Sequence, residues 1–206
     1  MRVMSGDSRL WRFVAQVLSW IFHPFVISVP TLWYAAYAMT NAAVASAQWT
    51  AFFIVIVILP AIVFIALRVR SGHYTDADVS VRQHRFSIYF FGGTCFVIGL
   101  VLFVGLGAPR ILVASLVAAI VALAMGTLVT TQTKASAHAG VTAGCAAVLF
   151  FVSIPVSILV GVAALTVGWA RIYLHQHTPT QVILGWVIAV ASVAVVFSVF
   201  MSLPFG

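Results

Sequence analysis

Apolar runs of about 20 residues recur along this 206-residue chain, and they limit its fold more than any other feature. About 20 apolar residues make a helix long enough to cross a bilayer. Only 6% of the residues are charged, against about a quarter in soluble domains, which excludes an ordinary water-soluble fold. The sequence therefore predicts an all-α, polytopic transmembrane helix bundle that forms one domain over residues 1–206.

Breaks within the apolar runs decide how many spans are expected. The first run is interrupted by His23-Pro24 and by Pro30, which membrane helices tolerate when neighbouring groups satisfy the backbone. The uncharged stretch 139–170 is either one over-long helix or two short helices broken near Pro155. The prediction is six to seven spans. They cover about residues 13–40, 50–69, 87–107, 111–130, 139–170 and 178–203.

Ten basic residues against three acidic ones give a formal charge of +7. Nucleic acid is not an expected partner, because so apolar a chain has no soluble surface to bind it. The charge fits the excess of Lys and Arg in cytoplasmic loops, or a site for an anionic ligand. Cys95 and Cys145 both lie in apolar segments and no metal-ligand spacing occurs, so no metal or cofactor is predicted.

Ionisable residues beyond the N-terminus gather in three polar segments, 68–85, 134–138 and 171–177. One such residue alone is most simply an interfacial side chain. Ionisable groups at the ends of membrane helices are costly unless they face a polar cavity, and three clusters of the same character favour a shared site. Arg side chains match the oxygens of a phosphate with paired donors. The cationic candidates for such a site are Arg82, Arg85, Lys134 and Arg171.

Two of these segments also read as helix starts. Ser136 is a good N-cap, which puts His138 in the first turn of the next helix. Thr178 and Gln181 have the spacing of a capping box, which puts His177 just before another helix. Free N–H groups and the helix dipole favour anions at such positions.

The motifs in these segments resemble those of the type 2 phosphatidic acid phosphatase superfamily, the membrane lipid phosphate phosphatases. The segment "ARIYLHQHTPTQ" has Arg171, five residues, His177, three residues and Gln181, similar to the family's third motif. "ASAH" places Ser136 and His138 as in the second motif, with alanines where the family has Pro and Gly. "DVSVRQHRF" matches the first motif only loosely. The resemblance covers about residues 65–190.

This resemblance implies a metal-free mechanism with two histidines. His177 would attack phosphorus and form a phosphohistidine, and His138 would protonate the leaving alkoxide and then activate water. Such catalysis divides one hard step into two easier ones. The phosphoryl oxygens would be held by Arg82, Arg85, Lys134, Ser136 and Arg171.

The chain departs from the family at the residue that orients the nucleophile. The family has Asp where this chain has Gln181, and an amide supplies no charge. Gln181 either accepts a hydrogen bond from His177 or only completes the capping box. Asp76 or Asp78 is expected to replace the missing carboxylate, since the only other acid lies in the N-terminal tail. His84 and His175 match no family motif and are interpreted as interfacial histidines.

A shared site requires the three polar segments to lie on one membrane face, so 139–170 must be two helices and the spans number seven. Nine of the ten basic residues then share that face and only Arg110 opposes them. The positive-inside rule places the face in the cytoplasm, with the chain in the cell (inner) membrane. A re-entrant first span would reverse this assignment.

The predicted function is hydrolysis of a lipid phosphate or diphosphate within the bilayer, of the phosphatidate, phosphatidylglycerol phosphate or polyprenyl phosphate class. Two alternatives stay open. Asp76 and Asp78, with His73 nearby, could bind Mg²⁺ in a membrane prenyl or alcohol-phosphate transferase. The chain could also be a catalytically degenerate protein that binds or transports a lipid phosphate. The sequence does not fix an oligomeric state.

Overall fold

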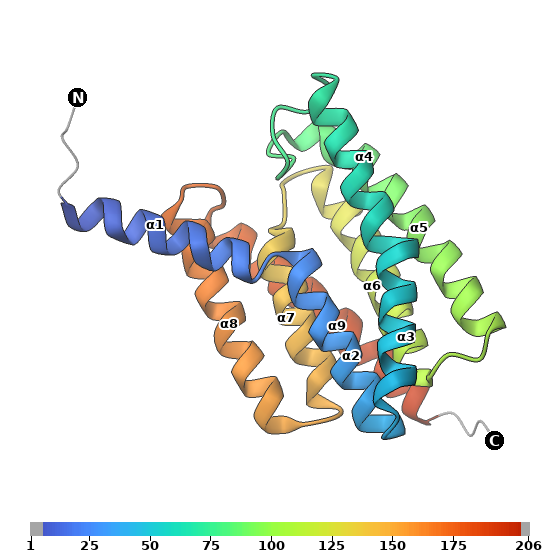
Figure 1. Ribbon diagram of the computed structural model, residues 1–206. Coiled ribbons are helices and arrows are strands. Elements are labelled where there is room, and N and C mark those ends of the chain that lie inside the picture. Colours follow the sequence, from blue (N-terminus) through green and yellow to red (C-terminus); the bar gives the residue numbers. More distant parts are fainter. Residues whose placement is uncertain (1–5, 203–206) are drawn as a thin grey trace.

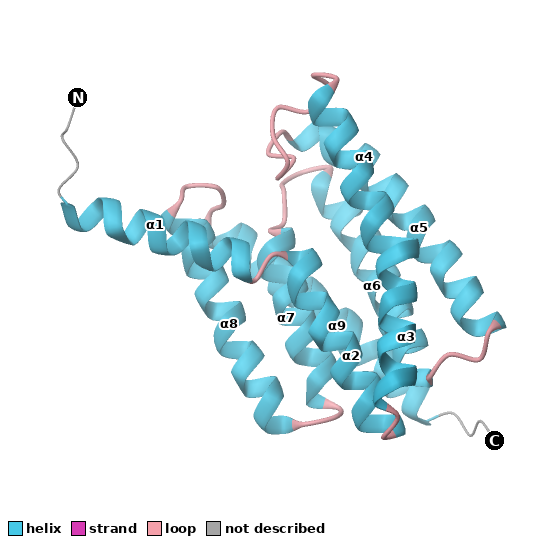
Figure 2. Cartoon of the chain, viewed as in Figure 1, coloured by secondary structure: helices cyan, strands magenta, loops and turns pink. Residues whose placement is uncertain are grey.

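The computed structural model describes residues 6–202, which fold into helices joined by short loops, with no strand in that range (Figures 1 and 2). Arg2 and residues 203–206, where the last predicted span ends, lie outside the described residues. The all-α prediction is confirmed. The α-helices are α1 (Gly6–Ile21), α2 (Pro24–Thr40), α3 (Ala43–Phe53), α4 (Leu59–Arg70), α5 (Arg85–Gly105), α6 (Arg110–Thr130), α7 (Ala137–Phe150), α8 (Ile154–Tyr173) and α9 (Pro179–Ser202).

Within residues 6–202, five helices are long and apolar enough to cross a membrane. The first of them, Ala43–Arg70, joins α3 and α4 through a π-helical turn at Ile54–Ile58, just before Pro60. Proline removes a backbone donor and crowds the preceding turn, which accounts for the widened turn at this point. The other four are α5, α6, α8 and α9. The bent pair α1–α2 raises the number to six, and α7, with 14 residues, is too short to add a seventh.

The stretch 139–170 is two helices, as the position of Pro155 predicts. Helix α7 ends at Phe150, and α8 begins at Ile154 with Pro155 in its first turn, where no intrahelical donor is needed. The Ser157 hydroxyl donates to the carbonyl of Ala146 across the turn at 2.8 Å. This turn therefore reverses the chain and returns it to the end of the bundle where α7 began.

Helices α1 and α2 meet at a bend of 46°, so the first apolar run is not one continuous helix but a broken span or a re-entrant pair. His23 caps α2 by accepting the Phe25 N–H at Nδ1, and Pro24 is the first residue of that helix. Helix α1 extends away from the bundle (Figure 1) and packs on α8, where Trp11 meets Trp169 edge to face at 6.0 Å. It exposes large apolar side chains such as Trp20, which is typical of a helix lying in a membrane interface.

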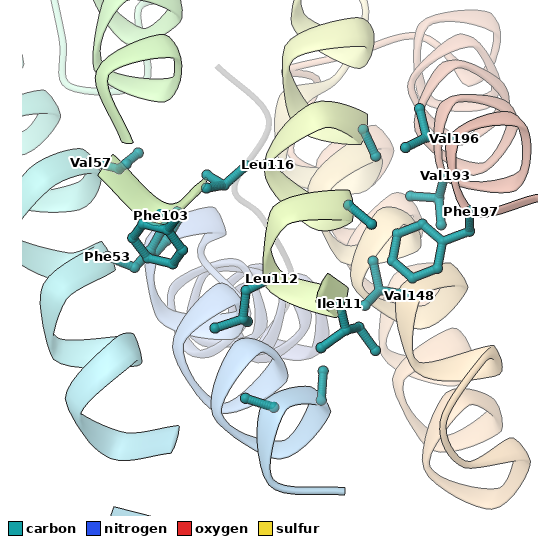
Figure 3. Packing of buried hydrophobic residues seen from close by; sticks show 14 of the residues in the cluster. Phe53, Val57, Phe103, Ile111, Leu112, Leu116, Val148, Val193, Val196 and Phe197 are labelled. Atoms are coloured by element: carbon teal, nitrogen blue, oxygen red, sulfur yellow. The ribbon is translucent and has the colours of Figure 1, made fainter. Parts of the chain in front are cut away.

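Packing of aromatic and aliphatic side chains around α6 and α7 holds the bundle together. Helix α7 contacts α2, α8 and α9, while α6 contacts α2, α5 and α9. Figure 3 shows two groups of buried side chains on either side of α6. One group contains Phe53, Val57, Phe103, Leu112 and Leu116, and the other contains Ile111, Val148, Val193, Val196 and Phe197.

Candidate functional site

The loops that follow α4, α6 and α8 carry the three polar segments, and hydrogen bonds tie them together. The Arg82 side chain, in a 3-10 turn at Arg82–His84, donates to the carbonyls of Thr131 and Gln132 at 3.2 and 2.7 Å. The Ser136 N–H donates to the carbonyl of Gln181 at 2.9 Å. Segments separated by 49 and 50 residues, and by a similar distance between Ser136 and Gln181, therefore meet at one end of the bundle.

Ser136 caps α7, as the sequence predicts. Its hydroxyl oxygen accepts the N–H of Ala139 at 3.5 Å, and His138 lies in the first turn. Both Ser136 and His138 are buried. The histidine is thus fixed by the helix start rather than by a flexible loop.

Gln181 does both things that the sequence left open. It completes the capping box, because its Oε1 accepts the Thr178 N–H and its own N–H donates to the Thr178 hydroxyl, each at 3.3 Å. The same Oε1 lies 3.1 Å from Nδ1 of His177. The amide Nε2 donates to the hydroxyl of Thr133 at 3.4 Å, which fixes the orientation of the amide. Since Oε1 only accepts, the proton of His177 lies on Nδ1, and Nε2 carries the free lone pair.

Two glycines bring the starts of α7 and α9 together. A Cβ at Gly185 would lie 2.5 Å from the carbonyl oxygen of Ser136, and one at Gly140 would lie 3.0 Å from that of Gly185. Larger residues would push the helices apart, and with them the segments that carry His138 and His177. Sequence reading missed this contact, because nothing marks two separated glycines as a crossing point.

Asp78 is the carboxylate at this site. Its Oδ2 accepts a hydrogen bond from the buried Arg171 at 3.0 Å, and its Oδ1 lies 3.9 Å from Nε2 of His138. Asp76 instead accepts hydrogen bonds from Thr75 and Ser80 within its own loop. Neither aspartate contacts His177 in the structure: Gln181 lies at Nδ1 of that ring, and Asp78 lies beside His138.

The expected phosphate ligands differ in their burial and in their hydrogen-bond partners. Arg85 is buried and donates to the carbonyls of Val79 and Ala135 at 3.0 and 2.8 Å. Val79 has a φ of 48°, a strained value for a β-branched residue, and this conformation aims its carbonyl at Arg85. Lys134 reaches the carbonyl of Ser80 at 3.4 Å. Arg82 donates to the two carbonyls that follow α6, those of Thr131 and Gln132, and so ties its loop to the end of that helix.

The electrostatics of the site keep His177 neutral. Burial, together with the positive charges of Arg85 and Arg171, lowers the pKa of His177 to about 3. Burial and the charge of Arg85 likewise lower the pKa of Lys134. A neutral imidazole with a defined tautomer is the form that attacks an electrophile.

Arg171 has one buried donor without a partner. The Asp78 carboxylate occupies Nη2, but Nε finds no acceptor in the described part of the chain. A buried guanidinium N–H left unpaired costs free energy, so an acceptor is expected there. The tetrahedral oxygens of a phosphate suit this donor.

His23 joins the site although sequence reading treated it only as a helix break. Its ring meets that of His138 edge to face at 4.8 Å. Among the described residues, His23, Asp78 and His138 form the one group whose side chains could hold a metal ion. The guanidinium of Arg171, on the same carboxylate, opposes a second cation at that position. The His-Pro pair at the head of α2 is the sequence signal that could have found His23.

Two of the three remaining histidines, His175 and His84, have structural roles. His175 is exposed and ends α8 in a left-handed conformation, with a φ of 57°. His84 stacks on Tyr74 at 5.4 Å. Neither contributes to the cluster around His138 and His177.

Comparison with protein-family models, with curated proteins and with solved structures found no match to this chain.

Proposed function

We propose that this chain is a metal-independent membrane phosphatase that hydrolyses a lipid phosphate or diphosphate through a phosphohistidine at His177. The observation that carries the proposal is the placement of two buried histidines, each at a helix start, at the end of the bundle that also holds a buried arginine whose Nε–H lacks an acceptor. Phosphoryl transfer without a metal needs a nucleophile, a general acid and a cationic group that donates hydrogen bonds to the phosphate.

In the first step, Nε2 of His177 attacks phosphorus and the bond from phosphorus to the lipid oxygen breaks. His138 gives its proton to that oxygen, and the lipid leaves as an alcohol, or as a monophosphate if the substrate is a diphosphate. In the second step, His138 removes a proton from water, whose oxygen attacks the phosphohistidine. Inorganic phosphate then leaves, and both histidines return to their starting state.

The cations supply the electrostatic part of catalysis. Arg85, Lys134 and Arg171 stabilise the charge on the phosphoryl oxygens, and the N-terminus of α7 adds backbone donors. The Asp78 carboxylate, 3.9 Å from Nε2 of His138, stabilises the positive charge of the imidazolium that donates the proton, against burial and the charge of Arg171, which lower the pKa of His138. Gln181 holds the tautomer of His177 but contributes no charge.

Purified protein is expected to release phosphate from a panel of lipid phosphates in EDTA at the rate measured without chelator. The reason is that cationic side chains, and no bound ion, neutralise the phosphoryl group. The measurement is inorganic phosphate release in detergent or nanodiscs, with and without added Mg²⁺.

Two results would contradict this. Activity that needs Mg²⁺ would favour a metal-dependent transferase, although Asp76 and Asp78 have different partners and do not converge on one ion. Folded protein that binds lipid phosphates without turnover would favour the degenerate binding or transport protein.

We further propose that the site faces the cytoplasm from the cell (inner) membrane. In the described chain Arg110, at the start of α6, lies at the end opposite to the polar segments, and the positive-inside rule then sets the orientation. A cysteine at the exposed Gln83 is expected to react with an impermeant maleimide only in inverted vesicles. The matched control, Leu106→Cys in the loop between α5 and α6, should react only from the other side. The reverse pattern would put the site on the outer face.

A further inference from the structure

A cavity of about 260 Å³ lies inside the bundle between α2, α3, α5, α6, α7 and α9. Ala135, Ser136 and Ala137 line it at the end that carries the histidines, and Phe103 and Leu112 line it at the other end. Its lining residues on α6 extend from Leu112 to Gly126, about 21 Å at 1.5 Å per residue. That length exceeds one leaflet of a bilayer whose apolar core is about 30 Å thick.

The cavity wall is mostly apolar, and four of its hydroxyl side chains are already engaged. Each hydroxyl donates to a carbonyl of its own helix, at 2.6 to 2.8 Å. They are Ser28, Thr31, Thr50 and Ser115. These four hydroxyls therefore need no further acceptor, and a polar ligand would lose its own hydrogen bonds among the apolar side chains of the wall. Smaller apolar cavities, of about 150 Å³, stay dry and bind hydrocarbon.

We propose that this cavity binds one hydrocarbon chain of the lipid phosphate, with the phosphate at the histidines and the chain running through the bundle toward Leu112. The inference rests on the proposed phosphatase function and adds where the hydrocarbon chain of the substrate binds. Continuity carries it, because Ser136 both lines the cavity and caps the helix that holds His138. A second hollow, between α7, α8 and α9, includes none of the polar site residues and is not its continuation.

A larger side chain that fills the cavity near the histidines tests this proposal. Gly126 lines the cavity and Gly92 does not, yet a Cβ at either position meets no atom within 4 Å. Gly126→Leu should lower kcat/KM for hexadecyl phosphate by about tenfold or more and leave that for butyl phosphate within about twofold. Gly92→Leu should leave kcat/KM unchanged for both substrates. Ser115→Leu, deeper in the cavity, should shift the preferred chain toward shorter alcohols.

Two outcomes would contradict the proposal. Chain-length profiles of Gly126→Leu and Ser115→Leu that match the wild type would show that the chain lies elsewhere. A loss on butyl phosphate equal to that on hexadecyl phosphate would mean a damaged site and would also reject the proposal.

A binding measurement separates this inference from the phosphatase proposal. Trp49 lines the cavity, so hexadecyl phosphate brominated along its chain should quench Trp49 fluorescence, and Trp49→Phe should remove that component. Quenching that Gly126→Leu abolishes, in a protein without turnover, would reject the phosphatase and keep the cavity site. Turnover without quenching of Trp49 would reject the cavity site alone.

Discussion

Replacing His177 with asparagine is expected to lower kcat for phosphate release by at least about 1,000-fold, because the attacking nitrogen is lost. Asparagine is the informative replacement, since its amide N–H can take the place of Nδ1–H and keep the hydrogen bond to Gln181. Thermal unfolding should therefore change little. The matched control is His175→Asn, at an exposed histidine two residues earlier, which should keep activity within about twofold.

Trapping the intermediate gives a second readout of the same prediction. His138→Asn should slow the attack of water on the phosphoenzyme, so lipid phosphate labelled with ³²P should leave an acid-labile, base-stable label on the protein. The label should be absent when His177→Asn is added. Label on another residue, or activity of His177→Asn within tenfold of the wild type, would contradict the assignment of the nucleophile.

The helix starts around both histidines could be predicted because capping depends on neighbouring residues. Ser136 precedes α7 and Thr178 precedes α9 as their sequences indicate. The break before Pro155 is local in the same way. Side-chain chemistry and spacing within one or two turns determine all three features.

Contacts between distant segments could not be predicted in this way. Asp78 and Arg171 are 93 positions apart, and His23 reaches His138 across more than half of the chain. Within the first polar segment Arg85 is buried, whereas Arg82 binds the end of α6, a difference that depends on the helix around them. Composition shows that such residues need polar surroundings, but only packing decides which surroundings each one finds.

The number of membrane spans likewise could not be predicted from the sequence alone. Hydropathy does not distinguish an interfacial helix from a crossing one when both are apolar, and α1 bends away from α2 at a His-Pro pair. Likewise, the sequence does not show that α7, a helix of 14 residues, packs inside the bundle against α2, α8 and α9.

Replacing Gln181 with glutamate is expected to raise kcat by about 10- to 100-fold, because a carboxylate stabilises the positive charge that His177 gains on bonding to phosphorus. Glutamate has the same shape as glutamine and still accepts from Nδ1 of His177 and from the N–H of Thr178. Thr133, which now accepts from the amide, can rotate its hydroxyl and donate instead. Gln181→Leu, which removes the acceptor, should lower kcat because the tautomer is no longer fixed.

The pH profile of the same variant gives the sign of the effect. The pKa of His177, about 3 in the wild type, should rise in Gln181→Glu because a negative charge favours the imidazolium. Since attack needs the neutral ring, activity is lost as pH falls through this pKa, and the acid limb of kcat/KM should move to higher pH. Gln132→Glu, which adds the same charge on an exposed loop, should not move it. An unchanged limb, together with unchanged kcat in both Gln181 variants, would mean that this amide only caps α9 and that His177 needs no partner to react.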